Sequence, residues 1–233
     1  MSSVNIIIAG AQREGNSILS ELEAKEILKE YGIPVVGGDL ATSEDEAVQL
    51  AAGFGYPVVL KVVSPQITHK SDSGGVKLNL KDAGEVLRAY REIMAKALEN
   101  CPGAEIKGVV VQPMARPGRE LVIGAVQDSQ FGPVVMFGLG GIFVEVLKDV
   151  SFRLAPVDHS EALDMLREIK GYRLLEGLRG ELPCDLEAIL NIIIRLSNLI
   201  YDYRDEVSEI DINPLFAYHD GAIAIDARII LKS

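Results

Sequence analysis

Tryptophan is absent from the 233-residue sequence, and cysteine and histidine are scarce, with two and three residues. The cysteines, Cys101 and Cys184, show neither the spacing of a metal site nor the framework of a disulfide-rich secreted domain. A zinc module and a disulfide-stapled domain are therefore excluded. The expected location is a reducing cytoplasm.

Positive charge is also in deficit, since 23 lysines and arginines stand against 34 aspartates and glutamates, for a net charge of −11. Proteins that bind nucleic acid or an anionic membrane generally present a basic surface. We therefore expect neither a nucleic acid nor a membrane as a partner. Any phosphate-binding site in this chain must be locally positive or assisted by a metal ion.

Long hydrophobic runs are missing as well. The longest, VNIIIAGA at residues 4–11, is too short to cross a bilayer, and it lacks the basic flank and cleavage site of a signal peptide. We interpret residues 4–9 as a buried strand.

The sequence does contain alternating strand and helix signals, over a length that can bury a sizeable core. Capping boxes at Ser20 with Glu23 and at Ser43 with Glu46 predict two helix starts, and Asp82 predicts a third. Further helices are expected near 160–170 and 185–202, and strands near 57–63, 75–80, 107–112, 120–127, 133–137, 206–212, 215–218 and 222–227. The pattern predicts an α+β fold of two α/β lobes. Residues 20–107 would form a lid lobe, and residues 1–19 with 108–233 the main lobe.

The segment 56–77, YPVVLKVVSPQITHKSDSGGVK, holds a strand lysine, a histidine and a glycine pair close together. Lys61 is the only charge in the apolar strand, and the Ser-Asp-Ser-Gly-Gly run can bring backbone N–H groups near phosphate oxygens. His69 is one of the few side chains that can carry a phosphoryl group covalently. The alternatives are a solvated edge lysine, a histidine bonded within its loop, and a simple turn.

Two common nucleotide motifs are absent from the sequence. The run FGLGGIF places Gly138, Gly140 and Gly141 after a strand, but Phe143 stands where a Rossmann loop needs Gly or Ala. No GxxxxGK[ST] loop occurs. A nucleotide site in this chain is therefore of neither the Rossmann nor the P-loop type.

A second polar group lies near the end of the chain, in EIDINP. Glu209, Asp211 and Asn213 share one face of the predicted strand because side chains alternate, and Asp226 is expected in the partner strand of a hairpin. Such oxygens suit Mg²⁺, which uses one or two carboxylates plus substrate phosphates. The alternative is the polar outer face of an edge hairpin, where acidic residues would face one another without lysine partners, which is unfavourable.

Four motifs, in this order, span nearly the whole chain: LKVVSPQITHKSDSGGV, VVVQPMARPGRELVIGAVQD, GLGGIFVEVLKDVSFRLAP and EIDINPL. Together they resemble the ATP-grasp β subunit of ADP-forming acetyl-CoA synthetase, an architecture similar to the nucleotide-binding half of succinyl-CoA synthetase. The resemblance implies an ATP-grasp fold with the nucleotide between the two lobes.

The resemblance also implies nucleotide contacts along the chain. Lys61 would contact the ATP phosphates, and Glu120 the ribose or base. The adenine-side hinge between the lobes would be formed by Gln112, Pro113 and Met114. A loop closing over the triphosphate, where an arginine can neutralise transferring phosphoryl oxygens, would contain Gly140, Gly141, Glu145 and Arg153.

The remaining implied roles are catalytic and metal-binding. In the family, an acyl phosphate forms on a separate α subunit, whose own histidine takes the phosphoryl group before a β-subunit histidine relays it to ADP. This implies that His69 is the phosphoryl acceptor of this chain and that Asp211 lies near the phosphohistidine. Asn213 and Asp226 match the Mg²⁺ ligands.

The implied function is the nucleotide-binding subunit for acetyl-CoA + ADP + phosphate ⇌ acetate + ATP + CoA, with Mg²⁺ and ATP or ADP as cofactors. Its partner would be an α subunit carrying the CoA-binding domain and the acyl-phosphate chemistry, in an α2β2 heterotetramer. Two alternatives stay open: a ligase subunit for another acyl-CoA (aryl, branched or succinyl), and a nucleotide-sensing module without turnover. An enzyme is favoured by the joint presence of His69, Lys61, Asn213 and Asp226, because a sensor needs no phosphoryl acceptor.

Overall fold

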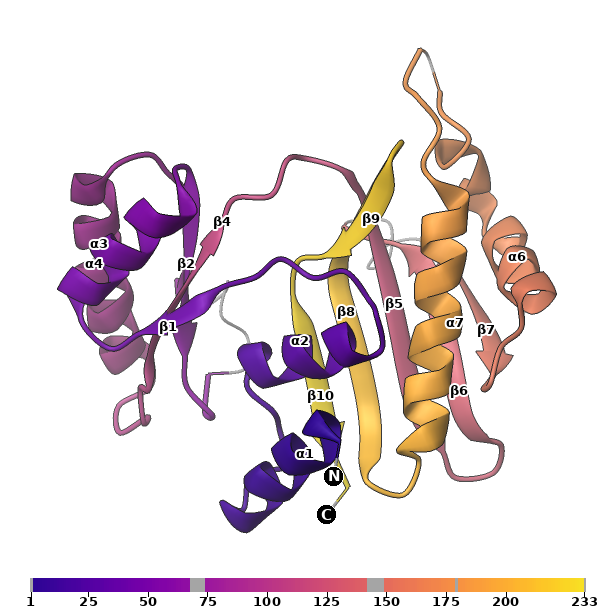
Figure 1. Ribbon diagram of the computed structural model, residues 1–233, viewed down its shortest axis with the longest axis horizontal. Coiled ribbons are helices and arrows are strands. Elements are labelled where there is room, and N and C mark those ends of the chain that lie inside the picture. Colours follow the sequence, from indigo (N-terminus) through magenta and orange to yellow (C-terminus); the bar gives the residue numbers. More distant parts are fainter. Residues whose placement is uncertain (1, 68–73, 142–148, 179, 233) are drawn as a thin grey trace. The chain divides into compact units, whose positions relative to one another are not determined.

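The computed structural model describes residues 2–67, 74–141, 149–178 and 180–232. The chain divides into two compact units, one formed by Met1–Val35 with Pro117–Ser233 and the other by Val36–Arg116 (Figure 1). The predicted lobes have similar extents but different limits. Residues 20–35, expected in the lid lobe, pack in the first unit, and residues 108–116, expected in the main lobe, belong to the second. No helix in the described ranges is long and apolar enough to cross a membrane.

The first unit is built on an antiparallel sheet, six-stranded in the described residues, in the order β10-β8-β5-β6-β7 with β9 paired to β8. Its strands are β5 (Arg119–Asp128), β6 (Gly132–Leu139), β7 (Val150–Leu154), β8 (Val207–Tyr218), β9 (Gly221–Ala224) and β10 (Ala227–Leu231). Its helices are α1 (Ser3–Arg13), α2 (Glu21–Glu30), α6 (His159–Glu168), the 3-10 helix η1 (Lys170–Leu174) and α7 (Leu186–Asp202).

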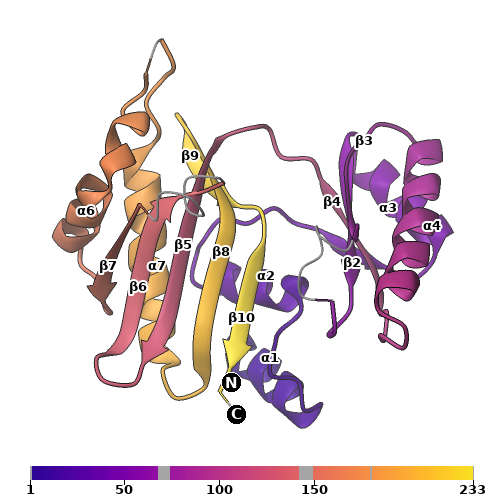
Figure 2. The ribbon, with the colours of Figure 1, turned by 180° about the vertical axis from the view of Figure 1, so that it is seen from behind.

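The core of this unit lies on one face of the sheet. Buried side chains from β5 and β6, among them Ala125, Val135 and Phe137, share a cluster with Ile193 and Leu196 of α7. In Figure 1, α7 lies in front of these strands, and α6 lies to its right, beside β7. In Figure 2, seen from behind, β5, β6 and β7 face the viewer with no described helix of the unit in front of them.

The prediction of a strand over residues 4–9 is wrong, because this segment is helix α1. Ser2 caps the helix by accepting a hydrogen bond from the backbone N–H of Asn5. Val4, Ile8 and Ala11 are buried at helical spacing. A short apolar run does not separate a helix from a strand by itself.

Two helix starts followed the sequence signals closely. Ser20 and Glu23 form the complete predicted capping box at the start of α2. Ser43 caps helix α3, but the carboxylate of Glu46 bonds to the backbone N–H and hydroxyl of Thr42, each at 2.8 Å. The second box is therefore only half formed.

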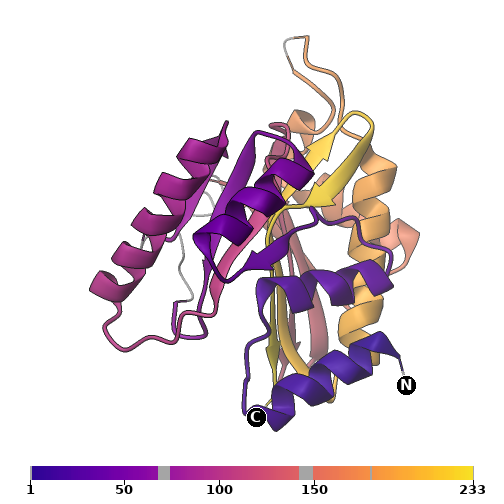
Figure 3. The ribbon, with the colours of Figure 1, turned by 60° about the vertical axis from the view of Figure 1, so that its left-hand side comes forward.

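The second unit has a sheet that is four-stranded in the described residues, in the order β1-β4-β2-β3. Its strands are β1 (Asp39–Ala41), β2 (Val58–Val63), β3 (Val76–Leu80) and β4 (Gly108–Pro113), and its helices are α3 (Glu44–Phe54) and α4 (Ala83–Asn100). Asp82 caps α4 as predicted. Both helices share a core with Val58, Leu60 and Val62 of β2 (Figure 3).

Candidate functional site

The second unit places Lys61 and Gln112 on the face of its sheet that the two helices leave open. Val58, Leu60 and Val62 point into the helix-covered core, so the alternating residue Lys61 points to the other face. Lys61 pairs with Val110, and two residues earlier in β2 Val59 pairs with Gln112, so Lys61 and Gln112 lie on the same face. Both polar side chains are buried, at 5% and 1% exposure. A cation and an amide thus lie near each other on one face, as a nucleotide site needs.

The chain leaves this sheet through Pro113 and Met114, which the sequence predicted as a hinge. Pro113 is the last residue of β4 and lies opposite Val58. The backbone N–H of Met114 donates to the carbonyl of Pro57 at 2.9 Å. These contacts fix the start of the connection to β5, but they do not test whether it contacts adenine.

In the first unit, the glycine pair after β6 packs directly on Glu120 at the start of β5. The N–H of Gly140 donates to the carbonyl oxygen of Glu120 at 2.8 Å. A Cβ at Gly140 would lie 2.9 Å from the carbonyl carbon of Glu120. Gly141 has a φ of +63°, and a Cβ there would lie 3.0 Å from the Glu120 carboxylate. Glycine is therefore required at both positions for this close approach.

The cluster of polar residues around Asp211, Asn213 and Asp226 differs from its prediction in two ways. β8 is one strand from Val207 to Tyr218, instead of two strands separated at Asn213-Pro214. Asp226 is not in the partner strand of the hairpin, because β9 ends at Ala224 and β10 begins at Ala227. It lies in the bend between them, and its Oδ1 accepts a hydrogen bond from the N–H of Ala227 at 2.9 Å.

The bend still brings Asp226 beside the polar face of β8. Ala227 pairs with Ile212, and Ala224 pairs with Leu215. The segment between Ala224 and Ala227, which contains Asp226, therefore lies opposite the segment of β8 that contains Asn213. Asp211 is half-buried on this strand. Its burial, and secondarily the charges of Glu209 and Asp226, raise the pKa of Asp211 above its ordinary value, while Arg228 acts in the opposite direction.

Arg228 is the residue that sequence reasoning missed at this site. It lies opposite Asp211 in the pair of β10 with β8, and its Nη2 is 2.5 Å from Oε1 of Glu209. A polar outer face, which the sequence disfavours because its acidic residues would face one another without lysine partners, is therefore less unfavourable, since Glu209 has an arginine partner. The signal was available, because Arg228 follows Asp226 by two residues in AIDARI. No group of three His, Cys, Asp or Glu side chains suited to a metal occurs in the described ranges.

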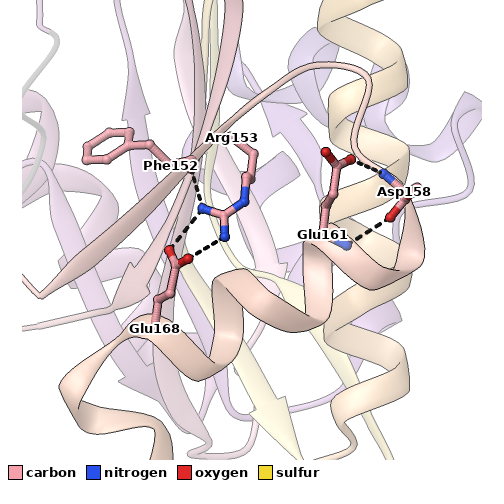
Figure 4. Close-up of polar contacts among 5 residues, drawn as sticks. All are labelled: Phe152, Arg153, Asp158, Glu161 and Glu168. Carbon is pink, nitrogen blue, oxygen red and sulfur yellow. Dashed lines mark hydrogen bonds and ion pairs between the residues drawn. The ribbon is translucent and has the colours of Figure 1, made fainter.

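Arg153 lies in strand β7, so its predicted placement in a loop is wrong. Its guanidinium binds the carboxylate of Glu168 in α6 through both Nη atoms, one of them at 2.9 Å (Figure 4). The same Nη1 donates to the carbonyl of Phe152 at 2.8 Å. Arg153 therefore ties the edge strand to the helix behind it. Its predicted contact with nucleotide stays a prediction.

Two predicted site residues, His69 and Glu145, lie outside the described residues. The others fall into two groups by unit. Lys61, Gln112, Pro113 and Met114 lie in the second unit. The first unit holds Glu120, Gly140, Gly141, Arg153, Asp211, Asn213 and Asp226.

The chain is similar to a known protein family and to proteins of known activity. A model of the ATP-grasp domain family matches residues 10–231. The chain is 55% identical over 225 residues to the β subunit of acetate–CoA ligase (ADP-forming) I from Pyrococcus furiosus, covering 97% of this chain and 96% of that subunit. It is 48% identical to ADP-forming acetate–CoA ligase I of Archaeoglobus fulgidus, covering 90% of this chain but only 30% of that longer protein.

Solved structures of acetyl-coenzyme A synthetase 1 from Candidatus Korarchaeum cryptofilum are also similar. The complex with coenzyme A and Ca-AMPCP gives a TM-score of 0.96 at 50% identity, covering 99% of this chain and 100% of that chain. The complex with coenzyme A and Mg-AMPPCP gives a TM-score of 0.87 at 46% identity, with the same coverage. In that second complex a phosphohistidine segment points towards the nucleotide-binding site.

Proposed function

Because the chain belongs to the ATP-grasp family, and within it to the β subunits of ADP-forming acetate–CoA ligases, we propose how its residues serve that reaction. The reaction is acetyl-CoA + ADP + phosphate ⇌ acetate + ATP + CoA. The β subunit supplies the nucleotide site and a phosphohistidine relay. The observation that carries this function is the match over nearly the full length of both chains to a separate β subunit.

The nucleotide contacts that we propose are taken residue by residue from the family pattern. Lys61 contacts the phosphates as a point charge. Gln112, Pro113 and Met114 would meet the base, and the exposed Glu120 would meet the ribose or the base. Gly140 and Gly141 would lie against the triphosphate, in a turn that the N–H of Gly140 anchors to the carbonyl oxygen of Glu120 at 2.8 Å. The ATP-grasp family binds a magnesium nucleotide, and adenosine phosphates are the nucleotides that we propose here.

Asn213 and Asp226 would hold Mg²⁺ together with the nucleotide phosphates. The donor chemistry suits a divalent cation, because an amide oxygen and a carboxylate are hard ligands that phosphate oxygens and water can complete. When bound, the metal ion neutralises negative charge on the phosphates. Asn213 is exposed on β8, where its amide oxygen is accessible to such an ion.

The relay passes a phosphoryl group through His69. A ring nitrogen of His69 attacks the phosphorus held by the α-subunit phosphohistidine, and the N–P bond on the donor breaks as the new N–P bond forms. The terminal phosphate oxygen of ADP then attacks the same phosphorus, which yields ATP and frees the imidazole. We propose that Asp211, on the same face of β8 as Asn213, serves this step by accepting a hydrogen bond from an imidazole N–H.

A separate β subunit requires an α subunit, and fused relatives carry the remaining domains in one chain. We propose an α2β2 assembly with this chain as one of the two β subunits. The α subunit would supply the CoA-binding domain and would make the acyl phosphate. The isolated chain should therefore not convert acetyl-CoA to acetate and ATP.

The test is phosphoryl labelling with and without the histidine. The wild-type chain, mixed with its α subunit and radiolabelled ATP, should acquire acid-labile, base-stable label on the β subunit. His69→Ala should lose this label and the exchange between ADP and enzyme, while acyl-phosphate formation on the α subunit continues. Label that survives the substitution would refute His69 as the acceptor. A parallel panel of acetyl-, aryl-, branched and succinyl-CoA tests the acyl group, and full activity without any α subunit would contradict the division of labour.

A further inference from the structure

Asp149 is a buried carboxylate that no step of the proposed function uses. Only 8% of the residue is exposed. Its Oδ1 accepts a hydrogen bond from the backbone N–H of Lys170, and its Oδ2 accepts one from the backbone N–H of Gly171, each at 2.7 Å. Hydrogen bonds to a carboxylate are stronger than those between neutral groups, and a buried charge needs such bonds. Asp149, directly before β7, therefore holds the start of η1 firmly.

The same 3-10 helix packs against Leu139, the last residue of β6. A Cβ at Gly171 would overlap the Leu139 side chain and would lie 3.2 Å from Oδ2 of Asp149. Gly171 does not have a positive φ, so the close approach is what requires glycine there. The start of η1 is thus in contact with the residue that ends β6 and with the residue that precedes β7.

These two chain segments also contact each other. Gly138 pairs with Val150, and a Cβ at Gly138 would lie 2.8 Å from the carbonyl oxygen of Asp149. On its other side β6 continues in register with β5, where Leu139 pairs with Leu121. The end of β6 is therefore held by β5, by β7 and by η1, and the carboxylate of Asp149 ties η1 to the start of β7.

We propose that Asp149 is a positioning residue for the glycine turn, Gly140 and Gly141, an inference that rests on the proposed function. The turn follows Leu139 directly, and the N–H of Gly140 donates to the carbonyl oxygen of Glu120 at 2.8 Å. This bond fixes the turn on the side of β5, whereas the clamp of Asp149 on η1 fixes the residue that precedes it. A displacement of Leu139 moves the turn, and a misplacement of about 1 Å can slow a reaction about a hundredfold.

The alternative is that Asp149 only satisfies the first N–H groups of η1, as a capping residue does. Asp158 provides the comparison within the same unit. Its carboxylate accepts a hydrogen bond from the N–H of Glu161 at 2.8 Å and caps α6 (Figure 4). Asp158 follows the opposite end of β7 from Asp149. Loss of either carboxylate removes a bond of the same kind, but at different distances along the chain from the glycine turn.

The experiment compares full-length variants, each assembled with the α subunit, by calorimetry with Mg·ADP and by steady-state kinetics. Asp149→Asn keeps one acceptor oxygen for two N–H groups, and Gly171→Ala keeps the carboxylate but forces η1 away from Leu139. We expect both to raise the dissociation constant of Mg·ADP and the KM for ADP by about tenfold. The KM for acetyl-CoA should not change, because the α subunit handles that substrate. A complex that is merely less stable loses active fraction, and hence kcat, without a rise in the KM for ADP.

Two further variants are the controls. Asp158→Ala loses its capping bond, so it should lower the urea midpoint of the complex and leave the KM for ADP unchanged. Gly141→Ala tests the glycine turn itself, because its Cβ would lie 3.0 Å from the Glu120 carboxylate at a φ of +63°. It should weaken Mg·ADP binding as the Asp149 variant does.

Each outcome has a distinct meaning. An unchanged KM for ADP in Asp149→Asn and Gly171→Ala, with a rise in Gly141→Ala, would overturn the inference and leave the proposed function intact. An equal rise in Asp158→Ala would overturn it as well, because the effect would then come from the general loss of a helix cap. Should Asp149→Asn fail to fold, Gly171→Ala decides in the same way. Normal Mg·ADP binding by Gly141→Ala, or none by the wild-type complex, would contradict the proposed function itself.

Discussion

Arg228 faces Asp211 across the pair of β10 with β8, yet its guanidinium bonds to Glu209, with 2.5 Å between Nη2 and Oε1. The nearest base in register is thus committed to a neighbouring carboxylate. Asp211 benefits from the charge of Arg228 only at longer range, and its burial outweighs this benefit. Burial of the charged form of Asp211 therefore lowers the stability of the fold. Carboxylates with shifted pKa values are common at functional sites.

Asp211→Asn should therefore stabilise the metal-free chain at pH 7. Folding raises the pKa of Asp211, so the native state binds its proton more tightly than the unfolded state does, and stability falls as the pH rises above the ordinary value of 3.8. Asparagine does not ionise, so the variant does not lose stability in this way as the pH rises. We expect a higher free energy of unfolding for the variant at pH 7, and a gain that shrinks as the pH is lowered to 4. Urea denaturation at both pH values, in the presence of EDTA, measures it.

Glu209→Gln is the control for that prediction, because it removes the partner of Arg228. It should lower the free energy of unfolding by up to about 1 kcal/mol, the usual value of a partly exposed ion pair. A loss of stability in both variants would show that the charge of Asp211 is well satisfied in the native state.

Asp226→Asn should weaken Mg·ADP binding at least tenfold, which corresponds to about 1.4 kcal/mol. The fold should persist, since an asparagine Oδ1 can still accept the hydrogen bond from the N–H of Ala227. Asp220→Asn, in the exposed turn between β8 and β9, is the matched control and should bind normally. Calorimetry with and without Mg²⁺ decides the matter, and equal affinities for the two variants would remove Asp226 from the metal site.

Lys61→Met should reduce nucleotide affinity at least tenfold, because it removes a positive charge held on a rigid strand while keeping most of the volume of the side chain. The control is Lys77→Met on the adjacent strand β3, where the lysine Nζ lies 2.5 Å from Glu92. Titration of both variants with ADP gives the comparison. A Lys61→Met chain that is folded and binds ADP as tightly as the control would contradict the phosphate contact.

Arg153→Gln and Glu168→Gln should each cost no more than about 1 kcal/mol of stability, because both side chains are partly exposed. The double variant should lose about as much as either single one, since the two residues make one shared interaction. Thermal denaturation of the four proteins completes this cycle, and additive losses would show that the pair contributes nothing. A loss of turnover in Arg153→Gln that Glu168→Gln does not share would support the predicted nucleotide contact.

The parts of the fold that the sequence predicted well are those that short-range signals control. Ser20 and Asp82 begin helices because their side chains satisfy backbone N–H groups three residues later, which is a local interaction. The apolar strands around Lys61 and Gln112 were also located correctly. The assignment of residues 4–11 failed because burial of Val4 and Ile8 against distant parts of the first unit decides their conformation.

For the candidate site residues, strand alternation predicted which side chains of β8 share a face, but not how the neighbouring strands meet them. The one-sided placement of Asp211 and Asn213 followed from strand alternation alone. The position of Asp226 in a bend did not, because β8 pairs with β9 on one side of Pro214 and with β10 on the other. The pairing of Arg228 with Glu209 depends on the same register, and that of Arg153 with Glu168 on the packing of α6 against β7. No local pattern encodes either.

The division of the chain into one continuous and one interrupted unit has a consequence for its biosynthesis. The second unit is a single stretch, Val36–Arg116, and its strands can all pair before the rest of the chain is made. The first unit must wait, since the N–H of Leu19 donates to the carbonyl of Ile229 and β5 pairs with β8 about ninety residues later. Such distant pairings form slowly and leave strand edges exposed in the meantime. The unit that contains Lys61 can therefore fold while the strand that carries Asp211 is still being synthesised, and it is during this interval that the chain is most exposed to aggregation.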